Sequence, residues 1–174
     1  MIVSPFCTIG PFFPFEFADE LSDLTKGARG EPITMTGRVL EEGGGPTRNS
    51  IVEIWQPDAN GVLNHAFDPR YAQRDPGFRG FGRARTEADG SYTLRTIMPG
   101  ASPDRAPHIN AMILAIGLTR RLVTTIFFSD ASDPVLNCVP IERRSLLIAQ
   151  KQTDGTYRFD FILRGDGETP FFLD

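Results

Sequence analysis

The chain has 174 residues and a formal net charge of −4, and 40% of its residues are hydrophobic while 23% are charged. This length and balance predict one soluble globular domain with a sizeable core, and the negative charge argues against a nucleic-acid partner. No apolar run approaches the roughly 18 residues that cross a bilayer, so no membrane association or signal peptide is expected. Two cysteines, Cys7 and Cys138, make no disulfide framework, so we expect a reduced, cytoplasmic protein.

Residues 1–30 are expected to form an N-terminal arm that precedes one β-sandwich domain over residues 31–174. Five phenylalanines and three prolines lie in Met1–Phe17, and disordered tails are poor in aromatic residues. We therefore expect the arm to pack on its own sandwich or on a partner chain. A short helix is expected over Phe15–Thr25.

The rest of the chain consists of short runs rich in β-branched and aromatic residues, which predict an all-β fold. Within Ser50–Gln56, Val52 and Ile54 face opposite to Glu53 and Trp55, as in a strand with one buried side. Many short strands and little helix favour a β-sandwich of mostly antiparallel strands. The expected strands are Ile33–Val39, Ser50–Gln56, Ser91–Ile97, His108–Ile116, Arg120–Phe128 and Thr156–Arg164.

Turn residues separate these runs. Asn60-Gly61, Asp89-Gly90 and Asp154-Gly155 supply the positive φ that tight hairpin turns require, so each predicts a hairpin. Asp133–Ser145 is expected to be a loop with one helical turn.

A series of motifs in fixed order occupies the stretch from Trp55 to Asn110, with one more motif near the N-terminus. Together they resemble the intradiol ring-cleavage dioxygenases, a family of β-sandwich proteins with non-haem ferric iron. The motifs are Thr8-Ile9-Gly10-Pro11-Phe12-Phe13, Trp55-Gln56-Pro57-Asp58-Ala59-Asn60-Gly61, Gly80-Phe81-Gly82-Arg83, Ile97-Met98-Pro99-Gly100 and Pro107-His108-Ile109-Asn110.

The iron ligands of the family are the point at which this chain departs from the resemblance. In an iron-binding subunit of the family, two tyrosines and two histidines hold Fe(III), and phenolate oxygens suit a hard ferric ion. The matching positions here are Leu63, Ser102, His108 and Asn110, so three of the four ligands are replaced. The resemblance therefore implies that this chain binds no metal and that a partner beta subunit holds the Fe(III).

For the chain itself, the resemblance implies the role of an alpha subunit in a two-chain enzyme of aromatic catabolism. The enzyme would insert O2 between the two hydroxyl-bearing carbons of protocatechuate, a small aromatic acid, giving 3-carboxymuconate. No catalytic residue is expected in this chain. The expected substrate-binding residues are Thr8, Gly10, Pro11 and Phe12, whose segment would reach the cleft of the partner.

The alternative for the arm motif is that Gly10-Pro11 forms an ordinary turn, since glycine and proline are common turn residues. An arginine of the family that could meet the substrate carboxylate is absent, because Ile116 stands in its place in the Ala115-Ile116-Gly117 turn.

The two histidines and Arg105 allow other interpretations of the site. A metal site rebuilt from His65, His108 and two of the tyrosines would need a geometry unrelated to that of the family. We expect instead that His108 is a hydrogen-bonded core histidine and that His65 is a surface residue of a loop. Arg105 is expected to be a relic of an active-site arginine or an ion-pair partner.

A cluster of arginines could steer an anionic aromatic acid, but interspersed acids favour an ion-pair surface. The cluster comprises Arg70, Arg74, Arg79, Arg83 and Arg85. The rival function is that of a non-enzymatic β-sandwich binding or scaffold protein that keeps a degenerate dioxygenase fold.

Overall fold

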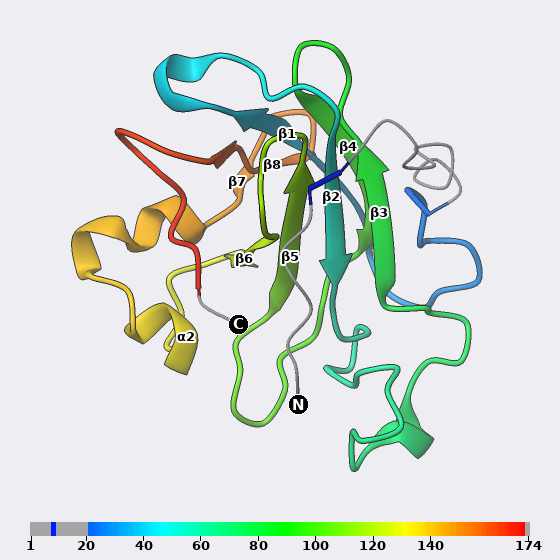
Figure 1. Cartoon of the computed structure of the whole chain (residues 1–174). Coiled ribbons are helices and arrows are strands. Elements are labelled where there is room, and N and C mark those ends of the chain that lie inside the picture. Colours follow the sequence, from blue (N-terminus) through cyan, green and yellow to red (C-terminus); the bar gives the residue numbers. More distant parts are fainter. Residues whose placement is uncertain (1–7, 10–20, 173–174) are drawn as a thin grey trace, which may run out of the picture.

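Two β-sheets pack face to face in the computed structural model, which describes residues 8–9 and 21–172 (Figure 1). We call them the β1 sheet and the β2 sheet, each after the first of its strands along the chain. The β1 sheet contains β1 (Pro32–Leu40), β4 (Ser91–Ile97), β7 (Gln150–Lys151), β8 (Tyr157–Arg158) and β9 (Phe161–Ile162). The β2 sheet contains β2 (Ser50–Trp55), β3 (Phe81–Arg85), β5 (His108–Ala115) and β6 (Leu122–Phe127).

The helical segments are short. They are η1 (Glu42–Gly44), η2 (Tyr71–Gln73), α2 (Pro134–Asn137) and η3 (Ile141–Leu147). The expected all-β sandwich is confirmed, and most strand pairs are antiparallel. The exceptions are β8 and β9, which both run parallel to β1. No helix among the described residues is long and apolar enough to cross a membrane.

The core lies between the two sheets and follows the period of the strands. Val52 and Ile54 of β2 are buried in it, while Glu53 and Trp55 face the other way and are partly exposed, as the alternation in Ser50–Gln56 predicted. The buried amide of Gln56 ties the sheets together at the end of β2, because its nitrogen donates to the Ile97 carbonyl (2.9 Å).

The expected strand Thr156–Arg164 is divided into β8 and β9, and the break lies beside a close approach at Gly37. A Cβ on Gly37 would lie 1.8 Å from the carbonyl oxygen of Phe159, so only glycine fits here. The same carbonyl accepts a hydrogen bond from the buried hydroxyl of Tyr92 (2.7 Å). Burial raises the pKa of Tyr92 well above its ordinary value, which keeps this hydroxyl protonated as a donor.

Three sequence expectations need correction or qualification. Asp154-Gly155 does join the antiparallel pair β7 and β8, but Asp89-Gly90 joins β3 to β4 in the other sheet, and Asn60-Gly61 lies in a long loop after β2. All three glycines have the positive φ that the sequence predicts, whereas the pairing of the flanking strands depends on distant parts of the chain. Residues 21–25 are not helical, and the remainder of the expected helix Phe15–Thr25 lies outside the described residues.

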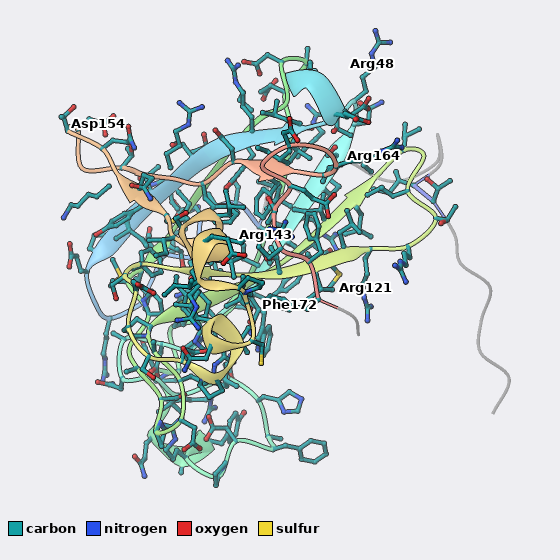
Figure 2. All side chains as sticks on the ribbon, turned by 90° about the vertical axis from the view of Figure 1, so that its left-hand side faces the viewer. Arg48, Arg121, Arg143, Asp154, Arg164 and Phe172 are labelled. Atoms are coloured by element: carbon teal, nitrogen blue, oxygen red, sulfur yellow. The ribbon has the colours of Figure 1, made fainter. Side chains whose placement is uncertain are left out.

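Three edge strands, β3, β4 and β6, are covered by other parts of the chain, which limits strand-to-strand aggregation. The Arg83 amide of β3 donates to the Leu21 carbonyl (3.0 Å), and the Leu24 amide donates to Arg95 of β4 (2.8 Å), so residues 21–24 connect the two sheets along one side. On the other side, the Phe172 amide donates to Val123 of β6 (2.8 Å). Figure 2 views that side, with Phe172 and Arg143 labelled.

Candidate functional site

The four positions expected from the motif order to correspond to the family's iron ligands lie at one end of the β2 sheet. Trp55, at the end of β2, pairs with Asn110 near the start of β5, so His108 and Asn110 belong to this end. Leu63 follows in the loop of residues 56–80, where its backbone amide donates to Asp68 Oδ2 (2.9 Å). Ser102 lies in the loop before β5.

The polar groups at these positions are engaged within the chain. His108 is 5% exposed, and its Nδ1 lies 2.7 Å from the Ala106 carbonyl. Burial lowers the pKa of His108, although the hydrogen bond to Ala106 opposes the shift, so the ring is neutral. The Asn110 side-chain oxygen accepts from the Thr125 hydroxyl (3.1 Å). The expectation of a hydrogen-bonded core histidine at 108 agrees with this arrangement.

These residues do not fit a ferric ion held by two phenolates and two imidazoles. Leu63 and Ser102 supply no phenolate, and an amide such as that of Asn110 is a poor ligand for Fe(III). Tyr92 is buried in the β1 sheet and bound to Phe159. No group of three or more His, Cys, Asp or Glu side chains in the described residues could hold a metal ion.

The second histidine does not rebuild the site either. His65 is exposed, as expected for a loop surface residue, and its Nδ1 accepts from the Phe67 amide (3.2 Å). Its ring contacts Trp55 edge-on, with 6.5 Å between ring centroids, and contacts Phe67 at 5.2 Å. His65 therefore belongs to an aromatic surface group.

Arg105 is held by a buried carboxylate. Its Nε donates to Asp133 Oδ2 (2.8 Å), and the Asp133 side chain is 0% exposed. The same carboxylate accepts from the Ala106 amide and, as the N-cap of α2, from Val135. Burial alone would raise the pKa of Asp133, but the hydrogen bonds from Arg105 and Val135 hold it below its usual value. Arg105 is thus an ion-pair partner, one of the two roles expected for it.

Buried or partly buried carboxylates organise the loop of residues 56–80. Asp58 accepts from the amides of Asn60 (2.8 Å), Val62 (3.0 Å) and Asp75 (2.7 Å). Asp68 accepts from Leu63 and Arg70, and these backbone hydrogen bonds lower its pKa. A network of this kind holds a loop in one conformation.

The arginine cluster is partly paired. Arg70 contacts Asp68 (3.4 Å) and the Gly61 carbonyl (2.6 Å), and the Arg74 guanidinium lies 3.7 Å from the centre of the Tyr71 ring. Arg83 pairs with Glu53 on the neighbouring strand. These contacts engage three of the five arginines within the chain, and those of Arg70 and Arg83 are ion pairs, as expected for an ion-pair surface.

Thr8 lies at the opposite end of the β2 sheet from the ligand positions. Its hydroxyl donates to the Ala115 carbonyl (3.1 Å) and accepts from the Gly117 amide (2.9 Å), while Ile9 is buried against Ile51. Ala115 is five residues along β5 from Asn110, or about 17 Å. The other expected substrate-binding residues, Gly10, Pro11 and Phe12, lie outside the described residues.

The hydrogen bonds of Thr8 bring together two segments that lie more than 100 residues apart in the sequence. The Thr8 hydroxyl bridges the turn that contains Ile116, and Ile116 is 48% exposed beside it. Any surface that Thr8 presents to a partner therefore includes this turn of β5 and β6.

Asp133 and Asp58 were not singled out as organising residues by the sequence. For Asp133 a signal was present, because aspartate directly before proline is typical of a helix N-cap followed by proline at the first helical position. For Asp58 no local signal identifies the Asp75 amide as a partner 17 residues away.

The comparisons with known proteins agree with the fold and the motif order. A family model described as "Dioxygenase" matches residues 15–165. The chain therefore belongs to the dioxygenase family, and the expected membership among the intradiol enzymes is confirmed. In fold, it is similar to an intradiol ring-cleavage dioxygenase from Tetranychus urticae, with a TM-score of 0.62 at 18% identity over 98% of this chain and 100% of that one.

Within the family, the chain is similar to the subunits of protocatechuate 3,4-dioxygenase. It is 32% identical to the alpha chain from Burkholderia cepacia over 97% of this chain and 96% of the relative. It is 39% identical to the Pseudomonas putida alpha chain over 83% of this chain and 77% of the relative.

A beta chain is also among the relatives. The beta chain from Burkholderia cepacia is 41% identical, over 85% of this chain and 73% of the relative. Percent identity therefore does not separate the two subunit types. The nearly complete two-way coverage of an alpha chain and the residues at positions 63, 102 and 110 favour the alpha type.

Proposed function

We propose that this chain is the alpha subunit of a two-chain protocatechuate 3,4-dioxygenase, in which a homologous beta subunit holds the Fe(III). One observation carries the proposal: Leu63, Ser102 and Asn110 stand at ligand positions in a fold that otherwise keeps the family's architecture. The relatives support it, because both alpha and beta chains of this enzyme match the sequence at more than 30% identity.

In the proposed complex, the arm and the turn that it contacts help to shape the partner's substrate pocket. Thr8 already lies at the turn of Ala115–Gly117, so Gly10, Pro11 and Phe12 would continue from an anchored point toward the partner. The proposed division of labour leaves binding and positioning to this chain and leaves oxygen chemistry to the iron-binding chain. The free Cys138 suits a reducing, cytoplasmic setting.

Co-expression tests the pairing directly. The tagged chain is produced together with an iron-binding beta chain from one plasmid that carries both genes, and the purified material is analysed for subunit ratio. We expect the two chains to purify in equal amounts as one species, because each would cover surface that the other exposes.

A matched expression of this chain alone is the control. If the chain forms the same stable homo-oligomer with and without the beta chain present, the pairing is absent. That result would favour the non-enzymatic scaffold function instead.

A further inference from the structure

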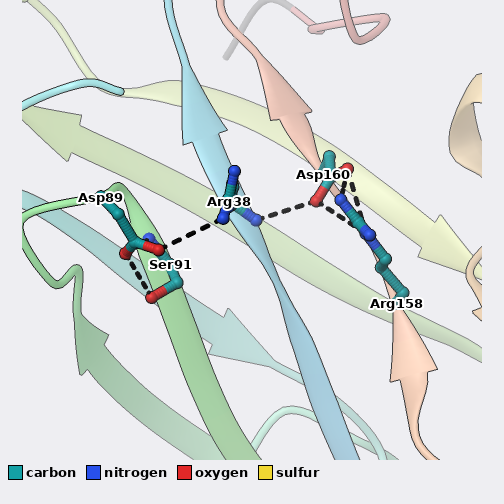
Figure 3. Close-up of polar contacts among 5 residues, drawn as sticks. All are labelled: Arg38, Asp89, Ser91, Arg158 and Asp160. Atoms are coloured by element: carbon teal, nitrogen blue, oxygen red, sulfur yellow. Dashed lines mark hydrogen bonds and ion pairs between the residues drawn. The ribbon is translucent and has the colours of Figure 1, made fainter. Parts of the chain in front are cut away.

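The outer faces of the two sheets differ in their charge. On the β1 sheet, Arg38 pairs with Asp89 (3.3 Å) and Arg158 pairs with Asp160 (2.8 Å), and both arginine side chains are more than half exposed (Figure 3). Arg95, also on this sheet, pairs with Asp23 (3.0 Å). Exposed ion pairs of this kind remain hydrated and contribute little to association, so this face is suited to solvent.

The outer face of the β2 sheet carries several large apolar side chains. Alternation places its side chains opposite to the core residues Val52, Ile54 and Ile113. We call this surface the β2 face. Its apolar members are Trp55, Phe81, Met112, Leu114 and Val123. Glu53 and Arg83 form an ion pair among them, and the polar residues Arg85, Asn110 and Thr125 lie on the same side of the sheet.

The register makes the β2 face continuous across the sheet. Met112 lies opposite Glu53 on one side and Val123 on the other, and Trp55 lies between Phe81 and Asn110. Trp55, Phe81, Met112 and Val123 belong to none of the core clusters formed by the described residues. These four side chains are therefore not used by the described core, whereas Leu114 packs against Ile9 and Ile51.

An aromatic group extends the β2 face at the end where β2 stops. Phe67 is 90% exposed, and its ring contacts His65, which in turn contacts Trp55. The loop that carries Phe67 is fixed by the carboxylates of Asp58 and Asp68. Contiguous exposed apolar groups mark interaction sites, and the contacts of Phe67 with His65 and of His65 with Trp55 make Phe67 part of such a group.

We propose that the β2 face, with Phe67 at its rim, is the docking surface for the iron-binding subunit. The inference rests on the proposed function and deepens it by assigning the surface. Aromatic residues, Met and Arg are enriched, and Lys, Glu and Asp depleted, in protein interfaces. The β2 face carries Trp55, Phe81 and Met112 with a single acid, Glu53, whereas the face of the β1 sheet pairs its arginines with Asp89 and Asp160.

The position of the N-terminal arm also supports docking of the iron-binding subunit on the β2 face. Ile9 packs on Ile51 and Leu114 at one edge of the β2 face, so the segment expected to reach the partner starts at this face. A partner seated here would be continuous with the arm contact at Thr8.

The test compares the same substitution on the two faces. Met112→Lys places a charge at the centre of the β2 face, where the new ammonium can reach Glu53 and leave the fold intact. Thr93→Lys, on the exposed face of β4, is the matched control. We expect Met112→Lys to weaken the dissociation constant with the beta chain by about 30-fold or more, and Thr93→Lys to change it by less than about threefold.

Thermal unfolding of each variant without the beta chain separates docking from folding. The inference is supported if Met112→Lys melts like the wild type and pairs poorly, and Phe67→Ser, at a fully solvated position, weakens pairing in the same direction. It is overturned if Met112→Lys pairs normally, or if it instead unfolds the lone chain because the chain's own N-terminal segment covers the face. If the wild-type chain pairs with no iron-binding chain, the proposed function itself fails.

Discussion

Oxygen uptake with protocatechuate is expected to be at least about 1,000-fold slower for this chain alone than for its complex with an iron-binding subunit. The reason is the donor set at the ligand positions: Leu63 and Ser102 offer no phenolate, and Asn110 offers an amide already bound to Thr125. Oxygen electrode measurements on the lone chain, the lone beta chain and the reconstituted pair check this expectation.

His108→Gln provides the control for this prediction. His108 is the one retained ligand-type residue, and its ring is held by Ala106 inside the chain. The complex with the variant should turn over within about twofold of the wild-type rate, once both are shown to assemble equally. A loss of turnover with normal assembly would mean that this chain's imidazole takes part in the chemistry.

Replacement of Asp133 by alanine is expected to lower the free energy of unfolding by about 3 kcal/mol. The buried carboxylate accepts from Arg105, Ala106 and Val135, and all of these donors would lose their acceptor together. Urea unfolding followed by circular dichroism measures the change.

Asp133→Asn separates charge from capping. The amide keeps an oxygen for the α2 amides but loses the ion pair with Arg105, so we expect roughly half of the alanine effect. Equal stability of both variants and the wild type would show that the network contributes nothing.

The same carboxylate predicts a pH dependence. Because the folded-state pKa of Asp133 is lowered, its ionised form stabilises the fold above the unfolded pKa of about 4, and this stability is lost as the pH falls through the folded-state value. Asp133→Asn should therefore lose less stability than the wild type between about pH 5 and pH 2. A variant that loses as much as the wild type would contradict the assignment.

The strands that alternate cleanly were predictable from the sequence. Ser50–Gln56 and Ser91–Ile97 correspond to β2 and β4 within one residue, because one face of each strand is buried. Phe81–Arg85 was missed as β3, since two arginines and Gly82 interrupt the apolar pattern. The break in Thr156–Arg164 lies opposite Gly37 and Arg38, where the Arg38 amide donates to the Asp160 side chain, more than 100 residues away. No local pattern reports such a contact.

The candidate site was predictable only in part. The order of the motifs placed the ligand positions 63, 102, 108 and 110, and the structure brings 108 and 110 to the end of β2 where the loop of residue 63 begins. The contact of Thr8 with Ala115 and Gly117 spans more than 100 residues, and sequence patterns carry no information on such pairs. The apolar β2 face depends on sheet order, which strand periodicity leaves open.

Iron content and visible absorption of the chain purified alone test the central claim most directly. Phenolate-to-iron charge transfer needs tyrosine ligands, so the account predicts a colourless chain with less than about 0.1 iron per polypeptide after growth in iron-supplemented medium. The complex prepared in parallel should carry one iron per pair of chains and absorb in the visible range. Stoichiometric iron with a visible band in the lone chain would contradict the account.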